Sequence, residues 1–367
     1  MVDWELAKVA GVRRQLLEWY GINRRELPWR QSSDPYAIWV SEIMLQQTRV
    51  AVVIDRYQAF MLRFPSLLSL AAAPEQSVLA MWSGLGYYRR ARMLHKAARY
   101  VAGRHDGRLP ATADELQLLP GIGVYTAAAI ASIAHGQRVA VVDGNVERVL
   151  CRMAGWDAAG RAGGAALQHK IADLAQHLVD PDRPGDFNQA IMELGATVCL
   201  PRNPRCPQCP ISKDCKTRGE HKTARRAPML SQEVAYALSV RMGRRRGATP
   251  RPTGPEVLLE QRPDSASVMP GLWELPLLRV PAVPDSELRM TVRHAIMQVN
   301  YYVRIRTVSK DDVNAMTIAS GKRRWVPLGK ADTMALTGLT RKVLTRAHLL
   351  QIARLDAIAP SRGKDLV

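Results

Sequence analysis

Residues 116–130 read LQLLPGIGVYTAAAI, and this stretch sets the architecture of the first half of the chain. Leucines at helical spacing end one segment, a Pro-Gly-Ile-Gly turn follows, and an alanine-rich run begins the next, which predicts a helix, a tight hairpin and a second helix. Gly121 and Gly123 permit positive φ and leave backbone N–H groups bare, so the start of the second helix favours a phosphate. A plain turn between two helices is the alternative reading of Gly-x-Gly.

On either side of this hairpin, from about Asp3 to Leu200, apolar residues recur at three- and four-residue spacing, which predicts a nearly all-helical region. Beyond a basic stretch, residues 234–240, 257–260 and 301–305 have the pattern of strands. The expected fold class is therefore a mainly α N-terminal region plus a smaller α+β C-terminal domain. We expect a helical domain over 1–219, a basic linker over 220–232, the second domain over 233–350 and a tail over 351–367.

The charge balance predicts a polyanionic partner. The chain has 367 residues, with 52 Lys and Arg against 33 Asp and Glu, and a formal net charge of +19. Such an excess attracts nucleic acid, whereas no basic amphipathic anchor for an acidic membrane surface is evident. No apolar stretch is long enough to span a membrane and the first residues lack a signal core, so we expect a cytoplasmic, nucleoid-associated protein.

Four of the five cysteines lie in one proline-rich segment with the spacing Cys199-x6-Cys206-x2-Cys209-x5-Cys215. Four thiolates that converge from so short a loop predict a metal centre, and the spacing alone leaves zinc and an iron–sulfur cluster both open. The fifth, Cys151, falls in a helical run and is expected to be a small buried apolar side chain.

Glu42 lies in a predicted helix that begins after Ser33 or Asp34 as its N-cap and continues to Thr48. It shares a helix face with apolar residues such as Trp39, where burial would raise its pKa and keep a proton available near neutral pH. Glu42 is therefore a candidate general acid. An ordinary glutamate at the edge of a solvated face is the alternative.

Asp143 follows the apolar run 139–142 and precedes a helical pattern, so we expect it to be the N-cap of a helix. Backbone N–H groups and the helix dipole favour the ionised carboxylate there. A neutral Glu42 paired with a charged Asp143 suits glycosidic cleavage, in which an acid protonates the leaving group and a carboxylate faces an oxocarbenium-like sugar. A purely structural N-cap is the alternative.

Residues 82–92 join flexible glycines, Tyr87, Tyr88 and several arginines. Aromatic rings beside arginine suit base stacking and phosphate pairing. A core tyrosine in a tight turn is the alternative.

Together these segments resemble the adenine DNA glycosylase (MutY) family, within the helix-hairpin-helix glycosylases that include endonuclease III. The resemblance covers nearly the whole chain. Its motifs are LPWR at 27–30, SEIMLQQT at 41–48, GLGYY at 84–88, LPGIG at 119–123, VDGNV at 142–146, FNQAIMELG at 187–195 and the cysteine spacing. The resemblance implies two helical lobes with an iron–sulfur loop, and a [4Fe-4S] cluster on Cys199, Cys206, Cys209 and Cys215.

The resemblance also implies a reaction on double-stranded DNA. Adenine mispaired with 8-oxoguanine or guanine would flip out of the duplex, and its N-glycosidic bond would be hydrolysed. Glu42 would protonate adenine N7 and Asp143 would stabilise the oxocarbenium ion, while Tyr125 and Asn145 would orient Asp143. Contacts to the base or the DNA are implied for Arg30, Trp29, Leu45, Gln46, Gln47, Thr48, Tyr87, Gln189, Gly121, Gly123 and Gln298, of which Gln46 and Tyr87 would wedge into the base stack.

One residue and two segments refine this expectation. Tyr125 stands where endonuclease III-like enzymes carry the lysine that forms a Schiff base, which implies base removal without strong strand cleavage. Residues 256–276 resemble a Nudix-like domain, but 277–281 lack the glutamates of a hydrolytic Nudix box. Residues Ile296, Met297 and Gln298 stand where the family has Phe-Ser-His in the hairpin that senses 8-oxoguanine, and Gln298 could supply a substitute hydrogen bond.

Two other functions fit part of this pattern. The pocket sets the excised base, so a thymine glycosylase acting on T:G mismatches in the same superfamily is one alternative. A non-catalytic DNA-damage binder is the other, and the presence of both Glu42 and Asp143 argues against it. We expect a monomer with no membrane partner.

Overall fold

The computed structural model describes residues 6–156, 164–221, 228–244, 252–318 and 320–350. The chain divides into two compact units, one of Met1–Ala72 with Met93–Arg226 and one of Ala73–Arg92 with Ala227–Val367. Residues 73–92, which we expected in the helical domain, thus belong to the C-terminal unit. Residues 222–227 of the expected linker and the whole expected tail lie outside the described residues.

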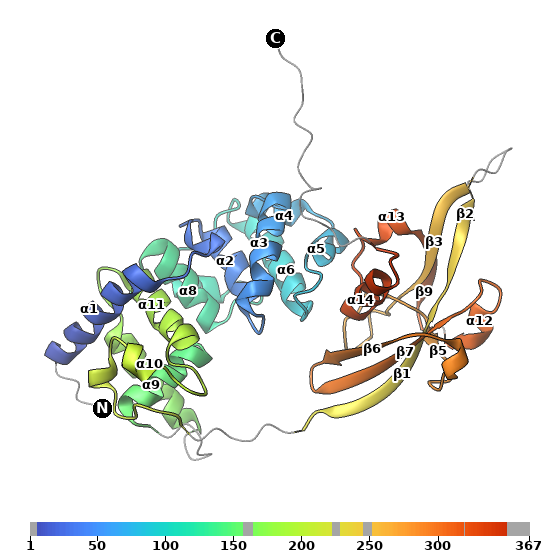
Figure 1. The fold of residues 1–367 in the computed structure, drawn as a ribbon. Coiled ribbons are helices and arrows are strands. Elements are labelled where there is room, and N and C mark those ends of the chain that lie inside the picture. Colours follow the sequence, from blue (N-terminus) through green and yellow to red (C-terminus); the bar gives the residue numbers. More distant parts are fainter. Residues whose placement is uncertain (1–5, 157–163, 222–227, 245–251, 319, 351–367) are drawn as a thin grey trace, which may run out of the picture. The chain divides into compact units, whose positions relative to one another are not determined.

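The first unit is helical, in agreement with the spacing of its apolar residues (Figure 1). Its last helix, α11, leads into the cysteine-bearing loop. The elements in chain order are α1 (Leu6–Asn23), η1 (Pro28–Arg30), α2 (Pro35–Leu45), α3 (Val50–Arg63), α4 (Leu67–Ala72), α6 (Arg89–Arg104, which begins in the second unit), α7 (Ala113–Gln117), α8 (Val124–His135), α9 (Gly144–Ala154), α10 (Gly164–Leu178), α11 (Pro184–Thr197), η2 (Cys206–Gln208) and η3 (Ser212–Asp214).

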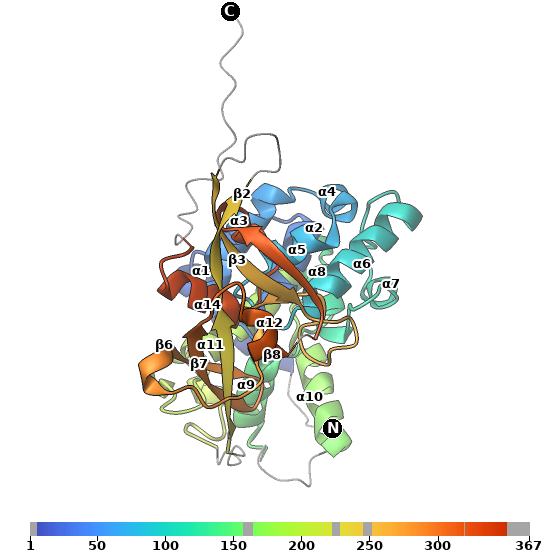
Figure 2. The ribbon, with the colours of Figure 1, turned by 90° about the vertical axis from the view of Figure 1, so that its right-hand side faces the viewer.

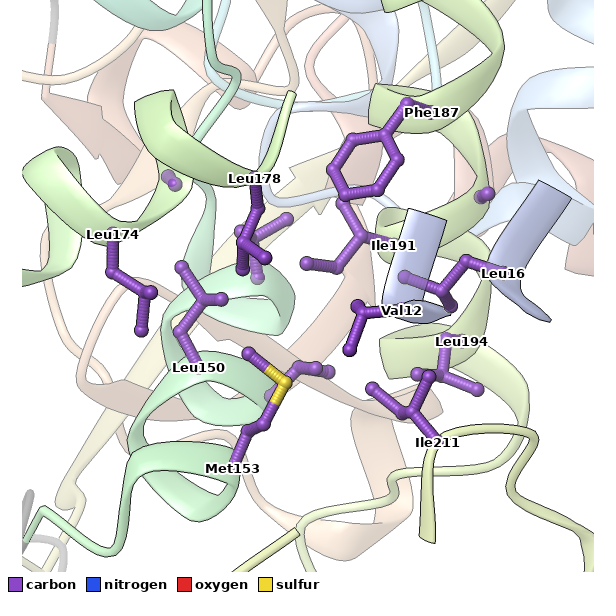
Figure 3. Close-up of a cluster of buried hydrophobic side chains, with 14 of the residues drawn as sticks. Val12, Leu16, Leu150, Met153, Leu174, Leu178, Phe187, Ile191, Leu194 and Ile211 are labelled. Carbon is purple, nitrogen blue, oxygen red and sulfur yellow. The ribbon is translucent and has the colours of Figure 1, made fainter. Parts of the chain in front are cut away.

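One core of this unit lies where α1, α9, α10 and α11 meet (Figure 3). Leu16 of α1, Leu150 of α9 and Leu194 of α11 contribute to it, and none of the three is exposed to solvent. The apolar residues of each helix produce this packing because their spacing puts them on one face. Cys151 is fully buried in the same core, as predicted.

Helix α2 is the element that carries Glu42. Asp34 caps it by accepting a hydrogen bond from the N–H of Tyr36 at 3.0 Å, as one of the two predicted caps. Every residue from Tyr36 to Met44 is buried, so α2 is enclosed on all sides and the predicted one-sided stripe does not describe it. The helix ends at Leu45 and not at Thr48 as predicted, which places Glu42 in its last turn.

The predicted helix, hairpin and helix are present as α7, a turn and α8. Gly121 has φ of 79°, and a Cβ on it would lie 2.6 Å from the Cβ of Met93, so the turn requires glycine there. Gly123 is the N-cap of α8 with φ of −92°, and no atom would crowd a Cβ at this position. Only the first glycine is therefore demanded by the backbone.

The second unit contains α5 (Glu75–Met81) and a set of strands and short helices. The strands predicted at 234–240, 257–260 and 301–305 correspond to β1 with β2, to β3 and to β7, whereas the pattern did not predict β6 or β9. The elements after α5 are β1 (Leu230–Leu238), β2 (Val240–Arg244), β3 (Pro252–Gln261), β4 (Trp273–Glu274), β5 (Leu277–Leu278), η4 (Asp285–Glu287), β6 (Leu288–Ile296), β7 (Val299–Thr307), α12 (Val313–Met316), β8 (Thr317–Ile318), β9 (Lys322–Pro327), α13 (Leu328–Ala331) and α14 (Gly338–Arg346).

Within the described residues these strands form two sheets. One has the order β6-β7-β1-β5-β8, with β1 parallel to β7 and the other pairs antiparallel. The other is built on β3, which pairs with β2, β4 and β9, and β2 and β3 run side by side in both views (Figures 1 and 2). Val343 of α14 shares a core with Val292 and Val303 of the first sheet, which gives the α+β character that we expected. None of the described helices is long and apolar enough to cross a membrane.

Candidate active site

A cavity of about 610 Å³ lies in the first unit, lined by residues of η1, α2, α8, α9 and α11. Its volume is within the range of about 300–1,000 Å³ typical of small-molecule sites. The fold thus gathers segments that are far apart in the sequence. The predicted site residues that line the cavity are Trp29, Arg30, Glu42, Leu45, Gln46, Gln47, Thr48, Tyr125, Asp143, Asn145 and Gln189.

Glu42 reaches this cavity from the last turn of α2 and is 6% exposed. Burial raises the pKa of Glu42 to about 7, because the charged form loses its hydration. The hydrogen bond from Tyr125 and the charge of Arg30 lower that pKa, and the charge of Asp143 raises it. Near neutral pH this carboxyl group therefore keeps a proton that it can donate.

Asp143 is the N-cap of α9, as predicted, and both oxygens of its carboxylate accept hydrogen bonds from the first turn of that helix. It accepts hydrogen bonds from the N–H of Asn145 at 2.9 Å, the N–H of Val146 at 2.8 Å and Nδ2 of Asn145 at 2.8 Å. Three N–H donors and the positive end of the helix dipole stabilise a negative charge at this position. Asn145 thus holds Asp143 in the way the resemblance implied.

Tyr125 has a different partner from the one expected. Its hydroxyl donates to Oε2 of Glu42 at 2.7 Å and also lies 3.6 Å from the sulfur of Met192, and it does not bond to Asp143. The physical reason is that Tyr125 lies in the first turn of α8, which packs directly on α2. The expectation that Tyr125 orients Asp143 is corrected: it orients Glu42.

A second charged group in the cavity wall was not predicted. Glu193 of α11 accepts from Nε of Arg25 at 2.6 Å and from Nη2 of Arg30 at 2.8 Å. Burial opposes the charge on Glu193, but the two guanidinium groups lower its pKa to about 2. The motif at 187–195 contains Glu193, and its position four residues after Gln189 on the same helix was the available signal.

Gln189 itself accepts a hydrogen bond from the hydroxyl of Tyr20 at 3.2 Å. Trp29 of η1 is buried and meets the ring of Tyr57 edge to face, with 5.5 Å between ring centroids. These contacts hold one polar amide and one aromatic ring in the wall of the cavity.

The segment after α2 contributes to the cavity as a loop, not as the helix that was predicted. Gln46 donates from Nε2 to the hydroxyl of Thr126 at 3.2 Å, and Gln47 has φ of 56°. The backbone leaves the helical conformation at Gln46, whose ψ is 114°, and Gln47 continues the turn.

The remaining predicted residues do not line this cavity. Gly121 and Gly123 form the hairpin before α8. Tyr87, 49% exposed with φ of 45°, is part of the second unit. Gln298 is exposed beside Met297 at the turn between β6 and β7, where its carbonyl accepts from the N–H of Leu230 at 2.9 Å. The wedge predicted for Tyr87 and the base contact predicted for Gln298 stay predictions.

The four loop cysteines, Cys199, Cys206, Cys209 and Cys215, line a second and smaller cavity together with Arg152 of α9. Arg152 donates to the sulfur of Cys199 at 3.3 Å, and its buried Nε has no partner among the described residues. Within the residues that the structure describes, no three Cys, His, Asp or Glu side chains form a group that could hold one metal ion. The thiols thus surround a hollow that is lined by a buried positive charge.

Helix α9 links this loop to the cavity. Arg148 donates from Nε to the carbonyl of Cys199 at 2.8 Å and from Nη2 to Oδ1 of Asn145 at 2.9 Å. Because Asn145 also bonds to Asp143, a continuous set of hydrogen bonds connects the loop backbone to the carboxylate. The loop therefore supports the position of Asp143.

The geometry agrees with three comparisons. Residues 40–195 match the HhH-GPD superfamily of base excision DNA repair proteins. The adenine DNA glycosylase of Homo sapiens is 50% identical over 228 residues, which cover 58% of this chain and 40% of the human protein. The adenine DNA glycosylase of Mus musculus is 44% identical over 326 residues, which cover 74% of this chain and 61% of the mouse protein. A solved structure of a thermostable thymine-DNA glycosylase, 32% identical, has a TM-score of 0.53 and is matched over 97% of its chain and 58% of this one.

The chain belongs to the HhH-GPD superfamily of base excision DNA repair proteins and, within it, to the adenine DNA glycosylase (MutY) family. It spans about half the length of the two curated relatives, 40% of one and 61% of the other.

Proposed function

We propose that the chain is a DNA N-glycosylase that removes adenine mispaired with 8-oxoguanine or guanine during base excision repair. One observation carries this proposal: the buried Glu42 and the Asp143 carboxylate, held by three N–H donors, line the same cavity. A neutral acid and a charged carboxylate are the two groups that glycosidic cleavage through an oxocarbenium-like transition state needs. The adenine DNA glycosylases among the relatives support adenine as the base.

The reaction follows from the two environments. Glu42 transfers its proton to N7 of adenine, so the base leaves as a neutral molecule when the bond to C1′ breaks. The Asp143 carboxylate stabilises the positive charge on the sugar, and Asn145 with the N-terminus of α9 holds that carboxylate in place. Water then adds to C1′, and the proton it releases restores Glu42, which leaves free adenine and an abasic site.

The lining of the cavity suits a flipped base. Trp29 offers an aromatic face, and Arg30 and Gln189 offer polar groups on the same wall. The base must leave the duplex to reach these groups. The net charge of +19 and the N-terminus of α8, which has no side-chain cap after the Gly121 hairpin, support binding to the phosphates of double-stranded DNA. We propose that the protein acts as a monomer on nucleoid DNA in the cytoplasm.

Tyr125 determines the type of reaction. Its phenol cannot form the Schiff base that a lysine amine would form with the sugar, and its hydroxyl already bonds to Glu42. We therefore propose hydrolysis of the base without strong strand cleavage.

A [4Fe-4S] cluster fits the cysteine loop. Four soft thiols line one small cavity, and four thiolates are the ligand set that such a cluster takes. Arg152 adds a buried cation with an unpartnered Nε beside the thiols, which suits an anionic cluster. Cys199, Cys206, Cys209 and Cys215 would hold the cluster, whose chemistry there is to cross-link and charge the loop.

For the C-terminal unit we propose a Nudix-like domain that recognises the base opposite adenine. Residues 277–281 form β5 and the segment after it and contain no glutamate, which supports recognition and not pyrophosphate hydrolysis. Gln298, exposed at the turn between β6 and β7, is the hydrogen-bonding side chain available there for 8-oxoguanine.

The specific alternative is a thymine glycosylase for T:G mismatches. It is favoured by the thermostable thymine-DNA glycosylase, which this chain matches over 97% of that structure's length. The same acid and carboxylate serve both reactions, so the polar lining of the cavity sets the base.

Release of adenine and of thymine, measured by chromatography, tests these functions. The substrates are duplexes with A opposite 8-oxoguanine, A opposite G, T opposite G and, as control, A opposite T. We expect adenine release from the first two and strand breaks only after alkali treatment. Thymine release would support the alternative enzyme, and tight binding without release of either base would support a non-catalytic binder.

A further inference from the structure

Glu193 occupies an unusual position in the wall of the active-site cavity. Its side chain is 0% exposed, and its carboxylate accepts from Nε and Nη2 of Arg25 at 2.6 and 2.8 Å and from Nη2 of Arg30 at 2.8 Å. Two guanidinium groups thus share one buried carboxylate, and the cluster carries one net positive charge beside the site.

The contacts of Arg30 are made with groups other than Glu42. Besides Glu193, its Nη1 donates to the carbonyl of Arg25 at 3.1 Å, and its guanidinium lies 5.5 Å from the centre of the Tyr20 ring. Glu42 and Arg30 nevertheless line the same cavity. A guanidinium released from Glu193 would be attracted to the other carboxyl group on the wall, because Glu42 is buried and charges interact more strongly there than in water.

We propose that Glu193 is a positioning residue that holds Arg30 away from Glu42 and thereby keeps the proton on Glu42. The proposal deepens the proposed function and rests on it for its kinetic test. Glu193 touches neither reacting atom and acts through Arg30. In this role the Arg25 guanidinium is a second hydrogen-bond partner of the Glu193 carboxylate.

The charged and titratable groups around both carboxyls set the direction of the effect. Tyr125 of α8, Asp143 at the N-cap of α9 and Arg30 of η1 face Glu42. Arg25, Arg30 and Tyr20 face Glu193. The charge of Arg30 lowers the pKa of Glu42 against the effect of burial. Loss of the negative charge of Glu193 leaves the charge of Arg30 uncompensated, so we expect the pKa of Glu42 to fall further. Loss of the positive charge of Arg25 removes a cation from the same cluster, so we expect that pKa to rise.

The kinetic test compares the pH profiles of single-turnover adenine release for wild type, E193Q, R25Q and D186N. Asp186 lies on the same helix in an exposed pair with Arg183 at 2.7 Å, so D186N is a matched loss of one carboxylate outside the cavity. The alkaline limb of the profile is the fall in rate at high pH, where Glu42 loses its proton. We expect it to move to lower pH in E193Q and to higher pH in R25Q. A shift of one pH unit changes the rate on that limb about tenfold. D186N should keep the wild-type limb.

A second readout does not depend on base release. The unfolding temperature is measured against pH for E193Q and for the E193Q/E42Q double variant. The difference between the two changes where Glu42 gains or loses its proton. Wild type and E42Q give the same titration in the presence of Glu193. We expect the pH at which this difference is half changed to be lower in the E193Q background. If that pH and the kinetic limb are both unchanged in E193Q, the inference is overturned. If E193Q does not fold, the test rests on R25Q. An alkaline limb of the R25Q rate profile that stays in place or moves to lower pH would overturn the inference. Wild type that releases no base would instead contradict the proposed function.

Discussion

The hydroxyl of Tyr125 donates a hydrogen bond to Oε2 of Glu42 over 2.7 Å and so joins α8 to α2 across the active-site cavity. Glu42 is held by a neutral donor and lines the cavity. This bond favours the charged form of Glu42, and burial, which favours the neutral form, outweighs it. The balance keeps Glu42 protonated until the pH approaches about 7.

Replacement of Tyr125 by Phe should therefore move the alkaline limb of activity to higher pH. The variant removes the one hydrogen bond that lowers the pKa of Glu42. The maximal rate should fall as well, because Glu42 loses its orientation. Single-turnover rates from pH 5 to 9 measure both effects, and a limb displaced to lower pH would contradict the assigned contact.

The variants E42Q and D143N should each lose base release. A general acid contributes about 10²–10⁴-fold to a rate, and we expect losses in this range or larger for both. Binding of an undamaged duplex should change little, because neither residue carries a positive charge. Turnover close to that of wild type in either variant would remove that residue from the proposed mechanism, provided that both fold.

The wild-type enzyme should lose activity as the pH rises through about 7. Glu42 must carry a proton to act as an acid, and its pKa is raised to about 7. The control is the binding of a duplex with the same mismatch, which should not follow this titration. A rate that stays constant from pH 6 to 9 would show that another group supplies the proton.

E42Q should be more stable than wild type at alkaline pH. The pKa of Glu42 is 4.5 in the unfolded chain and about 7 in the folded one, so folded protein holds a proton that unfolded protein releases in this window. Raising the pH from 4.5 to 7 therefore lowers the free energy of unfolding, by roughly 3 kcal/mol at most. Thermal unfolding of both proteins at pH 5 and pH 8 measures the effect. An equal pH dependence for wild type and E42Q would contradict the burial of Glu42 as the cause.

Gly121 and Gly123 form a matched pair for the hairpin. G121A places a Cβ 2.6 Å from the Cβ of Met93 at φ of 79°, and we expect a loss of about 1–3 kcal/mol in stability together with weaker duplex binding. G123A meets no atom within 4 Å at an ordinary φ and should fold like wild type. Chemical denaturation and duplex titration compare the two, and equal stability of both variants would refute the steric argument.

Local patterns predicted the elements wherever one residue type controls the backbone. The N-caps at Asp34 and Asp143 and the α7–α8 hairpin follow from short-range chemistry, because the bonds they make lie within three residues. The strands β5 and β8 were harder to predict, because each has two residues and pairs with a segment far along the chain. In contrast, β6 does alternate between more and less exposed residues, so its pattern was available and was missed.

The contacts between distant segments were beyond the reach of the pattern. Local patterns singled out Glu42 and Asp143, and the resemblance added Tyr125 but assigned it to Asp143, whereas its hydroxyl bonds to Glu42. Glu193 drew no attention in the sequence, although the fold gives it two arginines from another segment.

The order of residues along the chain determined the N-caps, the hairpin and the candidate acidic and carboxylate side chains, since these depend on neighbours within a few positions. Only the packing of α2, α8, α9 and α11 around one cavity decided which of those side chains meet. The physical reason is that burial and charge at a site are sums over groups brought together in space, so the state of Glu42 depends on Tyr125, Asp143 and Arg30 and not on its own stretch of sequence.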